Sequence, residues 1–166
     1  PVYKALMPYV VALFGIKQEG PKRYEVRHRG SGTLITLNGV FGILTAGHVI
    51  QELEPFETWA YASFNSTGEY SRMHSFPKAT CQSKRLGGDY DNTDGPDIGF
   101  IRLPDNISFL PTHETIFYNI MQRYNNARSR QGKTQERLPI HAIAGVIGQA
   151  SDMVEQVDCS TEVKTT

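Results

Sequence analysis

Cysteine is scarce in this sequence of 166 residues, which contains only Cys81 and Cys159. These two cysteines lie far apart and lack the spacing of a metal-binding motif. Small secreted domains commonly carry several disulfides, whereas disulfides are rare in the reducing cytoplasm. The low cysteine content therefore favours a cytoplasmic protein.

The sequence also lacks long apolar runs and an excess of either charge. No stretch approaches the roughly 18 apolar residues that indicate a membrane-spanning helix. Lys and Arg total 17, as do Asp and Glu, so no net field attracts nucleic acid or an anionic membrane. The basic stretch from Arg123 to Arg137 is diluted by Gln, Asn and Ser, and we interpret it as a solvated loop. We therefore expect neither a nucleic-acid partner nor a membrane partner.

The composition that is present, with 39% hydrophobic and 20% charged residues, is that of a folded domain. The dipeptide Asn38-Gly39 is typical of a type I′ hairpin turn, and helical spacing over Thr45–Leu53 predicts a short helix with Thr45 as N-cap. Short apolar or alternating segments predict strands at Tyr9–Ile16, Tyr24–His28, Gly32–Leu37, Val40–Leu44, Thr58–Phe64, Phe76–Gln82 and Asp97–Leu103. Many short strands and little helix indicate an all-β fold, either an antiparallel barrel or a sandwich.

The second half of the sequence is less regular. Gly87–Pro96 is dense in Gly, Asp and Asn, which predicts an exposed loop leading into the strand at Asp97. Beyond Pro104 the pattern loosens, which predicts a linker between lobes or a long surface loop. An apolar strand is expected again at Ile140–Gly148, and the tail from Ser151 alternates only weakly.

Two sequence motifs carry chemistry. The run GSGTLI at 30–35, followed by GILTAGHV at 42–49, resembles the stretch of trypsin-like (chymotrypsin-fold) serine proteases that carries the catalytic histidine, here His48. The run PDIGFIRL at 96–103 resembles the strand of the same family that carries the catalytic aspartate, here Asp97. Gly99 stands where the family usually has Ala, and Arg102 where it often has Lys. The two candidates are 49 residues apart, against about 45 in the known triad.

The resemblance implies a role for each residue. His48 would take the proton of a serine hydroxyl and later return it to the leaving amine, because a serine hydroxyl is a poor nucleophile at neutral pH. Asp97 would accept the Nδ1 hydrogen, fix the histidine tautomer and stabilise the imidazolium. The neighbouring acids Asp89, Asp91 and Asp94 lie in a polar loop and are interpreted as solvated. The resemblance implies a protein or peptide substrate and no metal or organic cofactor.

The catalytic serine is the missing member of the triad. It is expected about 93 residues after the aspartate, near position 190, beyond residue 166. The later serines Ser108, Ser129, Ser151 and Ser160, like Cys159, lack the G-x-S-G-G surround that supplies a nucleophile and an oxyanion hole. We therefore expect the serine and the oxyanion hole in a C-terminal segment that this sequence does not contain.

The resemblance also implies a division of the chain. Residues 1–110 would form the first trypsin-like β-barrel with His48 and Asp97, residues 111–138 an inter-barrel linker or long loop, and residues 139–166 the opening strands of an incomplete second barrel. The start Pro1-Val2-Tyr3-Lys4 departs from the I-V-G-G of digestive relatives, and Val49 stands where those have Cys. The sequence therefore resembles bacterial or intracellular members of the family more closely.

Three functions are compatible with these motifs. The first is a serine endopeptidase that cleaves peptide bonds with a Ser-His-Asp triad. The second is a catalytically inactive, protease-like binding or regulatory module. The third is a small β-barrel binding protein in which both motifs occur by chance. Retention of both His48 and Asp97 favours the peptidase, because a module freed from catalysis has no chemical need of either residue.

Overall fold

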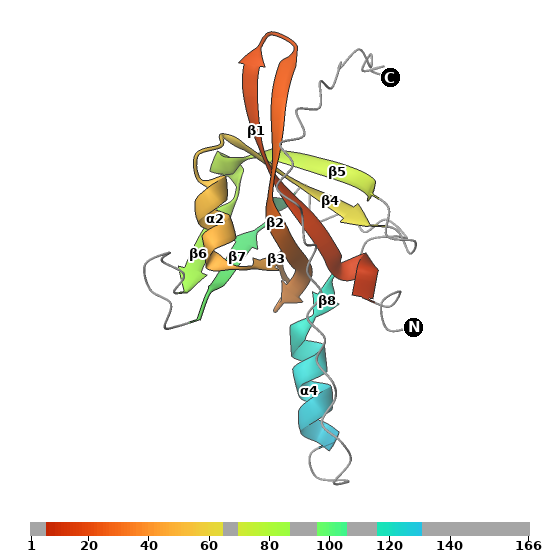
Figure 1. Cartoon of the computed structure of the whole chain (residues 1–166). Coiled ribbons are helices and arrows are strands. Elements are labelled where there is room, and N and C mark those ends of the chain that lie inside the picture. The colour runs from red at the N-terminus through yellow and green to blue at the C-terminus, as the bar shows by residue number, and fades with distance from the viewer. Residues whose placement is uncertain (1–5, 65–69, 87–95, 106–115, 131–166) are drawn as a thin grey trace.

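The computed structural model describes residues 6–64, 70–86, 96–105 and 116–130. These residues form an eight-stranded sheet with short helices (Figure 1). The strands are β1 (Val10–Gly20), β2 (Arg23–Leu37), β3 (Val40–Thr45), β4 (Thr58–Phe64), β5 (Tyr70–Pro77), β6 (Gln82–Leu86), β7 (Ile98–Arg102) and β8 (Tyr118–Asn119). The helices are the α-helices α2 (Gly47–Leu53) and α4 (Ile120–Arg130) and the 3₁₀ helices η1 (Met7–Tyr9) and η2 (Lys78–Thr80). The predicted all-β class is confirmed.

The sheet runs in the order β5-β4-β1-β2-β3-β7-β6, with β8 added in parallel to β2. Every pair along this path is antiparallel. The two strands at the ends of the path, β5 and β6, are consecutive in the chain and are joined only by η2 and Cys81. The path therefore ends close to where it begins.

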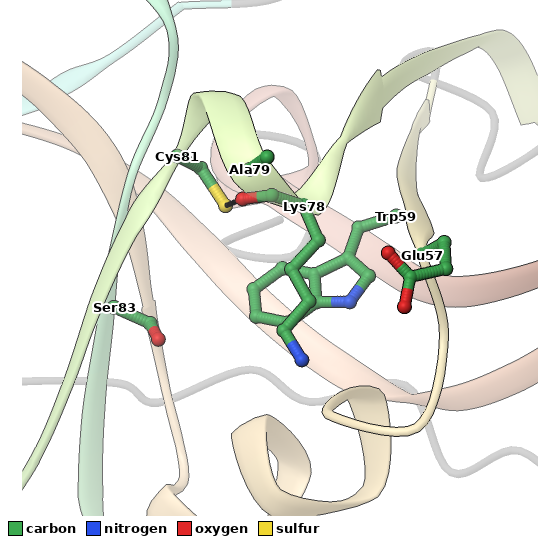
Figure 2. Close-up of a pocket in the computed structure, with 6 residues that line it drawn as sticks. All are labelled: Glu57, Trp59, Lys78, Ala79, Cys81 and Ser83. Atoms are coloured by element: carbon green, nitrogen blue, oxygen red, sulfur yellow. Dashed lines mark hydrogen bonds between the residues drawn. The ribbon is translucent and has the colours of Figure 1, made fainter.

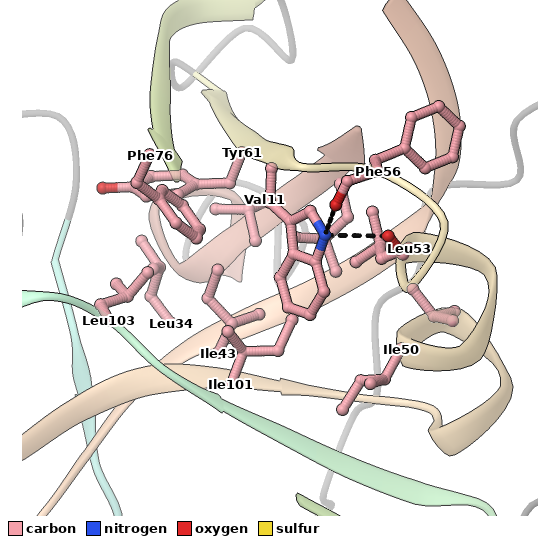
Figure 3. Packing of buried hydrophobic residues seen from close by; sticks show 13 residues of the cluster. Val11, Leu34, Ile43, Ile50, Leu53, Phe56, Tyr61, Phe76, Ile101 and Leu103 are labelled. Atoms are coloured by element: carbon pink, nitrogen blue, oxygen red, sulfur yellow. Dashed lines mark hydrogen bonds between the residues drawn. The ribbon is translucent and has the colours of Figure 1, made fainter. Parts of the chain in front are cut away.

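The core gathers residues from β5, at one end of this path, and from β7, next to the other end (Figure 3). Phe76 of β5 and Ile101 of β7 belong to the same buried cluster, together with Ile50 of α2. The largest member, Trp59, is 2% exposed, and its indole N–H donates to the carbonyls of Leu53 (2.8 Å) and Phe56 (3.0 Å). These two bonds fix the end of α2 and the turn after it against the sheet.

The first part of β1 is buried on both faces, which explains its apolar sequence, whereas the part from Lys17 to Glu19 is polar and exposed. Val11 and Leu13 face the main core, whereas Val10 and Ala12 pack with Met7 and Phe64 in a second, smaller cluster. The predicted Asn38-Gly39 turn is confirmed, because Asn38 has φ 51° and Gly39 φ 81°, the positive values that a type I′ turn requires.

The segment predicted as two strands, Tyr24–His28 and Gly32–Leu37, is the single long strand β2. The interruption that the sequence suggested is a β-bulge: Leu13 pairs with Gly30 and Phe14 with His28, so Arg29 is an extra residue. The first hairpin is also longer than predicted, since β1 continues to Gly20 and projects from the sheet with β2 (Figure 1).

Two local predictions were wrong. Phe76–Gln82 is not one strand: β5 ends at Pro77, η2 follows, and β6 begins at Gln82. Thr45 does not cap the helix, because its hydroxyl donates to the carbonyl of Ser31 at 2.6 Å. The chain is still β3 at Thr45, and α2 begins at Gly47 without a side-chain cap.

The region expected to be an inter-barrel linker or long loop, 111–138, contains a strand and a helix in the part that the structure describes. Tyr118 and Asn119 form β8 against β2, so the sheet also takes in residues beyond 110. Asn119 then accepts a hydrogen bond from the backbone N–H of Gln122 at 2.9 Å, an N-cap contact that starts α4. The part of the basic stretch up to residue 130 is therefore exposed helix rather than loop.

No helix in the described ranges is long and apolar enough to cross a membrane.

Several predictions concern residues outside the described ranges. They include the start of the chain, most of the loop Gly87–Pro96 and the strand Ile140–Gly148. The segment assigned to a second barrel, 139–166, also lies there, as do Cys159 and the residues Asp89, Asp91, Asp94, Ser108, Ser151 and Ser160.

Candidate active site

The pairing of β3 with β7 brings His48 and Asp97 together. His48 is the second residue of α2, just after β3, and Asp97 directly precedes β7. Because the two strands are antiparallel, with Thr45 opposite Gly99, the end of β3 and the start of β7 lie at the same edge of the sheet. Two residues that are 49 positions apart in the chain therefore meet at this edge.

Asp97 contacts His48 through both carboxylate oxygens. Its Oδ2 lies 2.5 Å from the ring Nδ1 of His48, and its Oδ1 accepts the backbone N–H of His48 at 3.0 Å. An ionised carboxylate can only accept, so the Nδ1 hydrogen is on the histidine and the Nε2 of a neutral ring carries the lone pair. The two contacts fix the orientation of the carboxylate and the tautomer of the ring.

The environment of Asp97 favours its ionised form. The hydrogen bond with the His48 side chain lowers the pKa of Asp97; partial burial opposes this, while the backbone N–H groups of His48 and Gly47 and the charge of His48 add to the lowering. The side chains of His48 and Asp97 are 42% and 40% exposed, so this pair lies at the surface. A carboxylate that is anionic at neutral pH stabilises an imidazolium beside it.

Close packing of α2 against the sheet depends on two glycines. A Cβ on Gly99 would lie 2.6 Å from Ile50 Cδ1 and 2.9 Å from the carbonyl oxygen of Ala46. A Cβ on Gly30 would lie 2.6 Å from Val49 Cγ2. The two residues that follow His48 therefore each pack against a position without a side chain. This gives a physical reason for a glycine at position 99.

Among the other candidates, only Ser129 lies in the described ranges. It is in α4, and its hydroxyl donates to the carbonyl of Asn126 at 2.9 Å, a local helix contact. The structure thus brings together His48 and Asp97 and associates no described serine with them.

A pocket of about 330 Å³ lies elsewhere on the sheet (Figure 2). It is lined by Glu57, Trp59, Lys78, Ala79, Cys81 and Ser83, and includes neither His48 nor Asp97. The thiol of Cys81 donates to the Lys78 carbonyl at 3.1 Å, and burial raises the pKa of this thiol. A thiol held in its protonated form is a poor nucleophile, so the surroundings of Cys81 do not favour thiolate chemistry.

Four residues that hold α2 in place were not predicted from the sequence: Gln51, Glu52, Arg29 and Arg85. Arg85 contacts Gln51, and Arg29 contacts Glu52, across 34 and 23 positions of the chain. Contacts at such separations leave no local sequence signal.

Comparisons with protein-family models, curated proteins and solved structures find nothing that matches this chain.

Proposed function

We propose that this chain carries the histidine and the aspartate of a trypsin-like serine endopeptidase. The observation that carries the proposal is the contact between His48 Nδ1 and Asp97 Oδ2 at 2.5 Å, between two motifs that resemble those of the triad. The backbone bond from His48 to Oδ1 adds to it, because it orients the carboxylate toward the ring. This is the arrangement that a general base needs from its aspartate partner.

The order of the strands supports a chymotrypsin-like barrel. Strands β5 and β6 act as the two halves of one bent strand: β5 pairs with β4, and β6 pairs with β7. In the proposed barrel, this bend joins the two ends of the path. His48 and Asp97 then lie at one rim of the barrel, where a second lobe can face them.

In the proposed reaction, a serine from a segment beyond this sequence attacks the carbonyl carbon of a peptide bond. The Nε2 of His48 takes the hydroxyl proton as the serine oxygen bonds to that carbon. His48 then gives the proton to the departing amine as the C–N bond breaks, which leaves an acyl-enzyme. Water repeats the two proton transfers and releases the carboxylic acid. Asp97 remains ionised throughout and stabilises the imidazolium.

Fluorophosphonate labelling of the product of the full reading frame tests this proposal, because the probe reacts with an activated serine. We expect the wild type to label and the variants His48→Ala and Asp97→Ala to lose labelling. The matched control is Asp105→Ala, which removes an acid that pairs with Arg102 on the surface and leaves β7 intact. No labelling of any folded form would overturn the peptidase proposal in favour of an inactive binding or regulatory module.

A further inference from the structure

Helix α2 carries His48 and has only seven residues. A helix of this length is not stable alone, so its position is set by contacts with the rest of the protein. Trp59 holds the end of α2 at Leu53, and the four residues before Leu53 supply further contacts. The first two are apolar: Val49 packs against Gly30 of β2, and Ile50 against Gly99 of β7.

The next two residues of α2 are polar, and each meets an arginine. Gln51 Oε1 accepts a hydrogen bond from Arg85 Nη1 at 3.0 Å. Glu52 Oε2 lies 3.9 Å from Arg29 Nη1, and the Arg29 guanidinium also lies over the ring of Phe56, 5.1 Å from its centre.

Each arginine is the neighbour of one of the two glycines. Arg29 directly precedes Gly30 in β2, and Arg85 of β6 is the cross-strand partner of Gly99 in β7. Gly30 and Arg29 therefore hold α2 on the side of β2. Gly99 and Arg85 hold it on the side of β6 and β7. The two sides differ in one respect, since Asp97 directly precedes β7.

We propose that Arg85 and Gln51 are positioning residues for His48. Their hydrogen bond connects α2, the helix that carries His48, to strand β6. Strand β6 pairs with β7, and Asp97 directly precedes β7. The bond is partly buried, where a hydrogen bond to a charged group is stronger than one on the open surface. The significance of this position rests on the proposed function of the His48 and Asp97 pair.

The consequence for reactivity follows from geometry. A catalytic base must be held within about 0.5 Å of its working position, and a shift of about 1 Å can lower a rate about 100-fold. Loss of the bond frees the β6 side of α2, while Ile50 still packs on Gly99 and keeps the helix folded. We therefore expect a loosened contact between His48 and Asp97 in a protein that remains folded.

Nuclear magnetic resonance on this chain tests the inference without a serine. The variants are Gln51→Ala, which keeps high helix propensity, and Arg85→Ala, with Lys84→Ala as the matched control on the same strand. The readouts are the exchange rate of the His48 Nδ1 hydrogen with water and the titration of the Asp97 carboxyl carbon. We expect about tenfold faster exchange and a rise of the Asp97 pKa toward its ordinary value in the first two variants, and wild-type behaviour in the control.

Two further measurements complete the test. The double variant Gln51→Glu with Arg85→Lys replaces the hydrogen bond by an ion pair between the same positions and is expected to keep the exchange rate close to that of the wild type. Fluorophosphonate labelling of the full reading frame is expected to slow about 10 to 100-fold in Arg85→Ala.

The possible failures are distinguishable. Wild-type hydrogen exchange and an unchanged Asp97 titration in folded Gln51→Ala would overturn the inference, whatever the labelling shows. If wild-type full-length protein does not label, the peptidase proposal fails, while the resonance comparison still decides whether Arg85 and Gln51 position His48. If Arg85→Ala does not fold, Gln51→Ala alone gives the decision, because it removes only the acceptor of the bond.

Discussion

Ile50 occupies the space in which residue 99 would carry a side chain, with its Cδ1 2.6 Å from the position of a Cβ. This contact lies next to His48 and Asp97, because Ile50 follows His48 by two positions and Gly99 follows Asp97 by two. The absence of a side chain at residue 99 therefore sets how closely α2 approaches β7.

Replacing Gly99 by Ala tests this contact. The new methyl group would meet Ile50 and the carbonyl of Ala46, and the backbone carbonyl cannot move away freely. We expect a loss of about 1–3 kcal/mol in the free energy of unfolding, measured by urea denaturation. Gly20→Ala is the control, since its Cβ would meet nothing closer than Arg23 Cβ at 3.8 Å. Equal stabilities for both variants would contradict the close approach.

Acidification should lower the free energy of unfolding by protonating Asp97. Its pKa is lowered in the folded state, so it binds a proton less readily than in the unfolded chain, where the ordinary value is 3.8. The contribution of Asp97 to the free energy of unfolding is therefore fully present well above pH 3.8. It is lost as the pH falls below that value toward the folded-state pKa. We expect Asp97→Asn to lower the melting temperature at pH 7 and to have little effect near pH 2. A constant difference across this range would exclude the linkage.

His74 should produce a separate pH dependence at higher pH. It is 9% exposed and stacks on Tyr61 with ring centres 5.0 Å apart; burial, and secondarily the charge of Arg72, lower its pKa below 6.5. The unfolded chain therefore takes up a proton first, and stability falls as the pH drops through about 6.5 toward the folded-state pKa. We expect His74→Phe to reduce the loss of melting temperature between pH 7 and pH 5. An unchanged loss of melting temperature in His74→Phe would contradict this linkage.

The indole N–H of Trp59 should contribute to stability separately from the bulk of the ring. Trp59→Phe keeps an aromatic ring in the core but removes the donor shared by the carbonyls of Leu53 and Phe56. We expect a loss of about 1–3 kcal/mol in the free energy of unfolding, because both buried carbonyls lose a partner. Circular dichroism should show an unchanged sheet, and hydrogen exchange should rise most at the end of α2. Wild-type stability would show that this hydrogen bond contributes nothing net.

The sequence predicted those features that depend on neighbouring residues. The turn at Asn38-Gly39 follows from two residues that tolerate positive φ, and most strands follow from apolar runs bounded by such turns. The proximity of His48 and Asp97 was predicted from two motifs and their spacing, and the structure brings these residues together. Their catalytic role stays a prediction.

The features that sequence reasoning missed depend on distant contacts. Thr45 has the residue type of an N-cap, yet its hydroxyl is used by the Ser31 carbonyl, 14 positions away. Most of helix α4 was predicted as a loop because its sequence is rich in Gln, Asn and Arg and has little apolar periodicity. Its N-cap contact, from Asn119 to the Gln122 backbone N–H, was not recognised. The hydrogen bond between Arg85 and Gln51 joins strand β6 to helix α2. The two residues are 34 positions apart, and no pattern within either segment indicates the bond.

The place of β7 in the sheet has a consequence for folding during synthesis. Strand β7 follows β6 in sequence but lies between β3 and β6 in space, so it completes the path after six other strands have been made. During synthesis His48 leaves the ribosome long before Asp97, and it has no carboxylate partner until β7 is inserted. The pairing of these two residues thus marks the completion of the antiparallel path from β5 to β6, and a partly folded chain lacks the arrangement that the proposed chemistry requires.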